Sequence, residues 1–474
     1  MIFSSIYFTF FFLPILLGLY FISKSSYRNY ILLIASLGFY AYGEPKFVSI
    51  MVLLIIANYI FAIIIDNNKN IVLKNMWMFL SIFINLGILF LYKYWDFTIK
   101  NINTICHTDI PIQNMTLPIG ISFFTFQALS YIIDVYRGST KAQKNPFFLA
   151  LYIIFFPQLI AGPIIRYNSV VEQIKQRAIS IEKFGYGTKR FICGFAKKVI
   201  IANNLSIVAE QVFSISDYTN VSALYLWIGT LCYSLQIFYD FSGYSDMAIG
   251  LGKMFGFDYE ENFNYPYTAR SITDFWRRWH ISLSKWFRDY VYIPLGGSKK
   301  GAYRQIINLL VIWLLTGIWH GANFTFIIWG LIYFIFLILE KFIIKPVQRN
   351  WVLKIIWQIC TLLIVNFQWV IFNSKSVKDA YYIILAMLGK NTSFFRENDA
   401  QICLVFREYG IFIFLGILFA MPIAKKISKM INTTGKTGIF LKSVSLPIGY
   451  IAIFFWAMSF LILGAHNPFI YFNF

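Results

Sequence analysis

Long apolar runs recur along the whole chain, and they constrain its fold more than any other feature of the sequence. Hydrophobic residues make up 58% of the 474 positions, whereas charged residues make up only 13%. A soluble core cannot absorb so much apolar surface, so the runs predict helices that cross a lipid bilayer. At about 20 residues per span, they predict an all-α, polytopic membrane protein with roughly ten to twelve transmembrane helices, some of them broken or re-entrant.

The basic residues between these runs predict an orientation. The first run, 2–22, has no basic residue ahead of it and no small-residue cleavage pattern, so we interpret it as a span and not as a removable signal peptide. Basic residues collect after the first, third and fifth runs, and such loops face the cytoplasm. The loop before the last run is also basic, so we expect both termini outside. That loop contains Lys425, Lys426, Lys429, Lys436 and Lys442.

Charge and cysteine content exclude two classes of function. The net charge of +20 follows from these basic loops, so nucleic-acid binding is not expected. The five cysteines are scattered, at positions 106, 193, 232, 360 and 403, which indicates neither a disulfide framework nor a thiolate metal site. No linker or repeat separates the two halves of the chain. We therefore expect a single transmembrane domain over residues 1–474 and no bound metal or cofactor.

The segment 274–304 combines aromatic and basic side chains. Apolar residues recur in it at three- and four-residue spacing, which predicts one interfacial helix with an aromatic face, ended by a turn at Pro294 and the following glycines. Its cations predict either a site for a ligand with several phosphates, such as the nucleotide part of coenzyme A, or simple attraction to anionic lipid. The candidates for binding the ligand are Arg277, Arg278, Lys299 and Lys300.

Two histidines are candidates for chemistry. His280 falls on the aromatic side of the predicted helix, where either a structural or a chemical role is open. His320 lies in an apolar stretch, and an ionisable group is costly there. Gly317 and Gly321 flank His320 and allow a substrate or another helix to approach the backbone. An imidazole suits general-base catalysis, in which it takes a proton from a hydroxyl or thiol that attacks an acyl carbonyl.

Two acids, Asp240 and Asp246, lie in another apolar run. Their spacing of six residues puts them on different faces of a helix, which disfavours a paired-carboxylate site. We expect each to tie its helix to a neighbour by hydrogen bonds. The alternative is a proton relay with His320 in a transporter or flippase of an anionic lipid or glycan. Such a protein would have inverted repeats, and the two halves of the sequence show none.

Several longer motifs run through the chain. The central ones are Tyr239 to Gly250, Glu261-Asn-Phe-Asn-Tyr-Pro-Tyr267, Trp276-Arg-Arg-Trp-His-Ile-Ser-Leu-Ser284, Tyr292-Ile-Pro-Leu-Gly-Gly297 and Trp319-His-Gly-Ala-Asn323; Leu117 to Gln127, Ile160 to Ile164 and Phe469 to Phe474 accompany them. Together they resemble the membrane-bound O-acyltransferase superfamily, and within it the bacterial alginate O-acetyltransferase branch. The likeness spans nearly the whole chain.

This resemblance implies roles for particular residues. The histidine matching His320 is the family's proposed catalytic residue, and the one matching His280 has a supporting or catalytic role. Trp319 and Asn323 would support the site, together with Asp240 and Asp246. The resemblance also implies transmembrane, re-entrant and interfacial helices around a central catalytic tunnel, where a cytoplasmic and an outer funnel meet near the histidine.

The resemblance further implies an activity and a location. The protein would be an O-acetyltransferase of the bacterial inner (cytoplasmic) membrane, with acetyl-CoA as co-substrate and an exported polysaccharide as acceptor. A periplasmic SGNH-type acetyltransferase would be its partner. The nearest alternative is a D-alanyl transferase of teichoic-acid modification, which uses the same histidine but takes its acyl group from a carrier protein.

Overall fold

The structure is a computed structural model that describes residues 1–218, 221–344, 350–390, 400–430, 438, 440–464 and 466–468. Every regular element within these residues is a helix, which confirms the all-α prediction. Lys436 of the predicted basic loop and the terminal motif 469–474 lie outside the described residues.

The chain forms two compact units. Unit 1 comprises residues 1–191, 247–260 and 285–291, and unit 2 comprises 192–246, 261–284 and 292–474. The helices α10, α12 and α14 contribute residues to both units. The division does not follow the order of the sequence, because segments from the middle of the chain return to unit 1. The single transmembrane domain stays a prediction.

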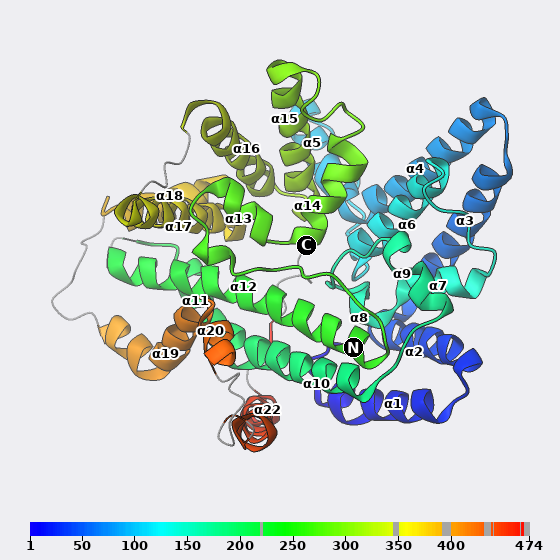
Figure 1. Ribbon diagram of the computed structural model, residues 1–474. Coiled ribbons are helices and arrows are strands. Elements are labelled where there is room, and N and C mark those ends of the chain that lie inside the picture. The colour runs from blue at the N-terminus through cyan, green and yellow to red at the C-terminus, as the bar shows by residue number, and fades with distance from the viewer. Residues whose placement is uncertain are drawn as a thin grey trace. The chain divides into compact units, whose positions relative to one another are not determined.

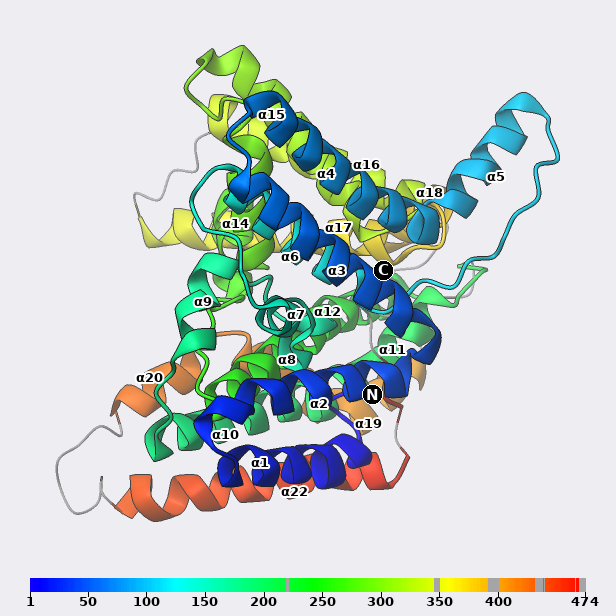
Figure 2. The same cartoon turned by 90° about the vertical axis from the view of Figure 1, so that its right-hand side faces the viewer.

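Unit 1 is built mainly from the first ten helices, and α1 runs alongside α2 (Figure 2). These helices are α1 (Leu13–Ile22), α2 (Arg28–Gly43), α3 (Val48–Asn67), α4 (Ile71–Lys93), α5 (Trp95–Cys106), α6 (Ile121–Tyr136), α7 (Pro146–Ile154), α8 (Phe156–Leu159), α9 (Tyr167–Lys175) and most of α10 (Ile181–Ala196).

Unit 2 contains the helices that carry the predicted site residues. They are α11 (Asn203–Phe213), most of α12 (Ala223–Met254), α13 (Ile272–Arg278), the start of α14 (Ile281–Phe287), α15 (Gly301–His320), α16 (Phe324–Ile338), α17 (Trp351–Asn373), α18 (Val377–Met387), α19 (Ala400–Phe419), α20 (Ile423–Met430) and α22 (Leu446–Ile462).

Eight helical stretches in the described part of the chain are long and apolar enough to cross a membrane. Two shorter apolar stretches, Phe8–Ile22 and Ile121–Tyr136, accompany them. The protein is thus a multi-pass membrane protein, whereas the count of ten to twelve crossings stays a prediction. The eight stretches are Pro45–Asn67, Ile71–Lys93, Ile181–Phe213, Gly301–His320, Phe324–Ile343, Trp351–Asn373, Ala400–Phe419 and Ser443–Ile462.

A buried amide pair joins α3 to α4 in unit 1. The Asn58 amide nitrogen donates to Asn85 Oδ1 over 3.1 Å, and the Asn85 amide nitrogen donates back to Asn58 Oδ1 over 2.9 Å. Ser81 Oγ adds a third bond to the same Asn58 oxygen. Without water in the bilayer, these groups must satisfy one another, so they fix the register of the two spans.

Glycines bring α15 and α16 together in unit 2 (Figure 1). A Cβ added at Gly317 would lie 2.5 Å from the Phe326 carbonyl oxygen, and one added at Gly330 would lie 2.4 Å from that of Trp313. Small residues of this kind allow helix backbones to approach closely. Of the two uses that the sequence left open for Gly317, the structure therefore shows the approach of another helix.

Gly317→Leu should loosen this helix pair, because its side chain would collide with backbone that cannot move aside. We expect a loss of roughly 1–3 kcal/mol, as for other overpacked interiors, measured as a lower midpoint of thermal unfolding of the detergent-solubilised protein. Gly87→Leu is the matched control, since a Cβ at Gly87 of α4 has no neighbour within 4 Å. Equal unfolding midpoints for the two variants would contradict the packing role of Gly317.

Candidate active site

The segment that the sequence predicts as one helix is broken at His280. Helix α13 ends at Arg278 and α14 begins at Ile281, while His280 between them has a left-handed backbone with φ 44°. The Ile281 N–H donates to the Asn262 carbonyl oxygen over 3.0 Å. The prediction of one continuous helix is therefore wrong, because a distant carbonyl captures the N–H. The aromatic face is nevertheless turned inward, since Trp279 is 3% exposed.

His280 is enclosed by other side chains. It is 1% exposed, its Nδ1 lies 3.2 Å from Asn262 Oδ1, and the Phe241 ring packs edge-on against it at 4.6 Å between centroids. Burial lowers the pKa of His280 to about 3, because a charged imidazole would lose its hydration there. The ring is therefore neutral at physiological pH.

His320 is the last residue of α15 and is 5% exposed. Its ring contacts those of Trp329 and Phe372, each at 5.0 Å between centroids. The centroid of the Trp319 ring lies 4.9 Å from that of His320 and 6.0 Å from that of His280. The fold therefore brings both predicted histidines to one indole, in a site walled by aromatic rings.

An aromatic cluster and one carboxylate position α13 in this site. Trp276 of α13 packs edge-on against Trp313, Tyr333 and Trp329 of α15 and α16. Glu340, beyond the end of α16, accepts hydrogen bonds from the N–H groups of Ile272 and Thr273 at 2.5 and 2.8 Å. A carboxylate is stabilised at a helix N-terminus by such donors and by the helix dipole. Glu340 does not stand out in the sequence, because no local spacing relates it to α13.

Asn323 caps the helix that follows His320. Its Oδ1 accepts from the Thr325 N–H over 3.0 Å, and its amide nitrogen donates to the Lys375 carbonyl oxygen over 3.0 Å. The first bond satisfies a backbone donor at the start of α16, and the second joins this turn to the segment before α18. Asn323 thus fixes the turn after His320.

Asp240 and Asp246 pair with two consecutive lysines. Asp240 Oδ1 lies 2.6 Å from Lys198 Nζ, with both side chains 2% exposed, and Asp246 Oδ2 lies 2.7 Å from Lys197 Nζ. Both lysines begin a π-helical segment, Lys197–Ala202, in the stretch that continues from α10 into α11. The two acids therefore bind α12 to that stretch by ion pairs. The two lysines were not predicted from the sequence as partners of these acids, because they lie more than 40 residues away in the chain.

The four cations predicted to bind the donor differ in their surroundings. Arg278 Nε lies 2.8 Å from Asp274 Oδ1, one turn earlier in the same helix, so this acid offsets its charge. Arg277 on α13 is exposed, as are Lys299 and Lys300 in the turn before α15. Within the described residues, Arg277, Lys299 and Lys300 form no ion pair, so their charges are available to a ligand.

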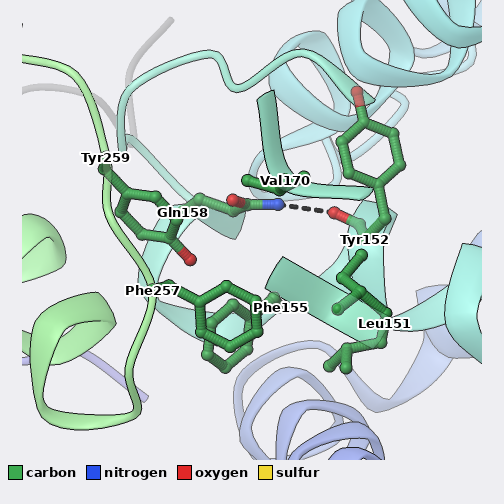
Figure 3. A pocket seen from close by; sticks show the side chains of 8 residues that line it. Leu151, Tyr152, Phe155, Gln158, Val170, Phe257 and Tyr259 are labelled. Carbon is green, nitrogen blue, oxygen red and sulfur yellow. Dashed lines mark hydrogen bonds between the residues drawn. The ribbon is translucent and has the colours of Figure 1, made fainter. Parts of the chain in front are cut away.

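Unit 1 has a small cavity, and none of the predicted site residues line it (Figure 3). Its wall is mainly apolar, and the Gln158 amide nitrogen donates across it to the Tyr152 carbonyl oxygen over 2.5 Å. The described residues also include no cluster of three or more histidine, cysteine or acidic side chains that could hold a metal ion.

The model of the membrane-bound O-acyltransferase family matches residues 60–384, which is more than half of the chain. The chain belongs to this family. Its members are acyltransferases, so the protein is an enzyme that transfers acyl groups, and the matched region includes both histidines of the site. Family membership thus favours acyl transfer over the transporter hypothesis.

Relatives within the O-acyltransferase family extend the likeness to the full length. A probable alginate O-acetylase AlgI of Pseudomonas putida is 38% identical and covers 100% of both chains. A peptidoglycan O-acetyltransferase of Helicobacter pylori is 35% identical over 82% of this chain and 80% of its own length. A teichoic acid D-alanyltransferase of Bacillus subtilis is 30% identical over 60% of this chain and 73% of its own length. The chain thus resembles the O-acetyltransferases over more of its length than it resembles the D-alanyltransferase.

Asp240→Asn should destabilise this acyltransferase strongly, because it removes the carboxylate beside a buried lysine charge. We expect a loss of about 3–5 kcal/mol, the usual range for one partner of a buried pair, seen as a lower unfolding midpoint of the purified protein.

The matched control for this variant is Glu172→Gln. Its carboxylate pairs with Lys175 at 3.0 Å, but the two side chains are 80% and 55% exposed. Loss of such a surface pair should change stability by no more than about 1 kcal/mol. If Asp240→Asn unfolded at the same temperature as this control, the structural role of the buried pair would be refuted.

Proposed function

We propose that the protein transfers an acetyl group from acetyl-CoA in the cytoplasm to a hydroxyl group destined for an exported polysaccharide. The acceptor hydroxyl belongs either to the polysaccharide or to a periplasmic SGNH-type partner protein. The observation that carries this proposal is the buried site in which His280 and His320 flank Trp319. The similarity to an alginate O-acetylase and a peptidoglycan O-acetyltransferase supports acetyl as the group and a glycan as its destination.

His320 acts as the general base in this proposal. Its imidazole removes the proton from the acceptor hydroxyl while the oxygen attacks the thioester carbonyl. The new C–O bond forms, the C–S bond breaks, and the imidazolium returns the proton to the leaving thiolate. The rings of Trp329 and Phe372 exclude water from His320, which protects the thioester from hydrolysis.

The donor enters from the cytoplasmic side, and the outside location that we propose for both termini fits that orientation. The exposed cations Arg277, Lys299 and Lys300 are the groups that we propose for binding its phosphates. Arg278 contributes less, because Asp274 offsets its charge. The location that we propose is the bacterial inner membrane.

D-alanyl transfer to teichoic acid is the second candidate function, since a D-alanyltransferase is among the relatives. The two functions share the site chemistry and differ in the donor, which is acetyl-CoA in one and a carrier protein loaded with D-alanine in the other. The ester that accumulates on the cell surface distinguishes them.

His320→Ala should abolish acetylation, because the base is lost while the small side chain fits the same space. We expect the O-acetyl ester content of cell-surface polysaccharide to fall at least about 100-fold in a deletion strain complemented with this variant, a loss typical for a general base. The amount of protein in the membrane is measured in parallel.

His107→Ala is the control, since His107 is exposed at the end of α5 and should leave acetylation unchanged. Full acetylation with His320→Ala would overturn the proposal. Loss of D-alanine ester with unchanged acetyl ester would instead establish the second function.

A further inference from the structure

Asn262 makes a cluster of contacts that points to a specific task. The residue is fully buried, at 0% exposed, although it lies outside every helix. Its Oδ1 accepts from the Ser282 N–H over 3.1 Å and from Ser282 Oγ over 2.9 Å, and it lies 3.2 Å from His280 Nδ1. One side-chain oxygen therefore meets three groups at the break between α13 and α14.

The bond from the Ser282 backbone identifies this atom as oxygen. An amide side chain can be turned so that its oxygen and nitrogen exchange places, but a backbone N–H only donates and therefore requires an acceptor. Because Oδ1 is an acceptor, the His280 Nδ1 beside it must carry the hydrogen. A neutral imidazole has a single N–H, so Nε2 carries the lone pair.

The backbone reinforces this arrangement. The carbonyl oxygen of Asn262 accepts the Ile281 N–H, so the same residue holds the loop through both its main chain and its side chain. His280 keeps φ 44°, a conformation that is unfavourable for a residue with a side chain. Strain of this kind persists only where the surroundings impose it, and it occurs often at active sites.

We propose that Asn262 is a positioning residue that holds His280 in the Nδ1-protonated tautomer, so that Nε2 meets the substrate as an acceptor. The consequence for catalysis rests on the proposed function. His280 then accepts a hydrogen bond from an N–H or O–H group of a substrate other than the hydroxyl that His320 deprotonates, because that hydroxyl has a single hydrogen. It cannot donate a hydrogen bond from Nε2 to the carbonyl oxygen of the acyl group.

The tautomer can be measured directly in the intact protein. The chain has four histidines, so ¹⁵N-histidine magic-angle-spinning NMR of the full-length protein in lipid bilayers has few signals to resolve. We expect one neutral ring between pH 5 and pH 8 with the hydrogen on Nδ1, and His280→Gln should remove that signal. A His280 ring with its hydrogen on Nε2, or a charged ring at pH 7, would overturn the proposal without any variant of Asn262.

Asn262→Asp tests the positioning role through pH. The described groups that contact the ring are uncharged; they are Phe241, Trp319, Asn262 and Ser282. This variant replaces one of them with a carboxylate. A carboxylate at hydrogen-bond distance stabilises the charged imidazole and should raise the pKa of His280 by about 1–3 units. The lone pair would then be lost as pH falls through this higher pKa, so the NMR titration should show His280 becoming charged at a higher pH than in the wild type.

Two further variants complete the test. Asn262→Ala removes the acceptor without adding charge, so we expect acyl transfer to fall about 10- to 100-fold, the range seen when a residue that orients a metal-binding histidine is lost, with no rise in the pH at which His280 becomes charged. Asn264→Asp is the matched control, because Asn264 lies two residues away and is exposed. It should leave both the rate profile and the NMR titration unchanged.

The outcomes separate this inference from the proposed function. If His320→Ala stays active, the acyl-transfer proposal falls, while the tautomer measured by NMR still stands or falls by itself. If His320→Ala is inactive but His280 titrates identically in the wild type and Asn262→Asp, the role of Asn262 is refuted and acyl transfer through His320 remains.

Discussion

Polar groups inside this protein have to be satisfied by other protein groups, because the membrane supplies no water to hydrogen-bond with them. The amide pair of Asn58 and Asn85 meets this condition between α3 and α4 in unit 1. In unit 2, the buried ion pair of Lys198 and Asp240 meets it between α12 and the stretch that continues into α11. Apolar surface brings the helices into the bilayer, and polar contacts such as these, together with close glycine packing, fix which helices meet and in which register.

The same requirement shapes the candidate active site. A neutral His280 needs an acceptor for its single N–H, and Asn262 provides it at the cost of breaking a helix. The role that we propose for His280, as a hydrogen-bond acceptor, therefore depends on both the backbone and the side chain of Asn262. The α15–α16 pair places His320 against Trp329, and Glu340 ties α13 to the end of α16. The two histidines and their aromatic walls are thus held by contacts from several distant segments.

Part of this arrangement could be predicted from the sequence. The all-α membrane class follows from the apolar runs, and the two histidines stand out because ionisable groups are rare in such surroundings. The pairing of Arg278 with Asp274 was also readable, since the two residues lie four apart on one helix. The break at His280 was not predictable from local spacing, because Asn262 competes with the helix for the Ile281 N–H, and that competition depends on tertiary contact.

The sequence by itself determined that this protein lies in a membrane, that it is helical, and which residue types are available for acyl transfer, because composition and periodicity are local properties of the chain. Only the tertiary structure decided that His280 and His320 share Trp319, that Asn262 sets the hydrogen on one imidazole, and that the acids of α12 pair with lysines. These are relations between segments far apart in the chain. These contacts gain their energy when folding removes the polar groups from water, because each group then has only the other as a partner.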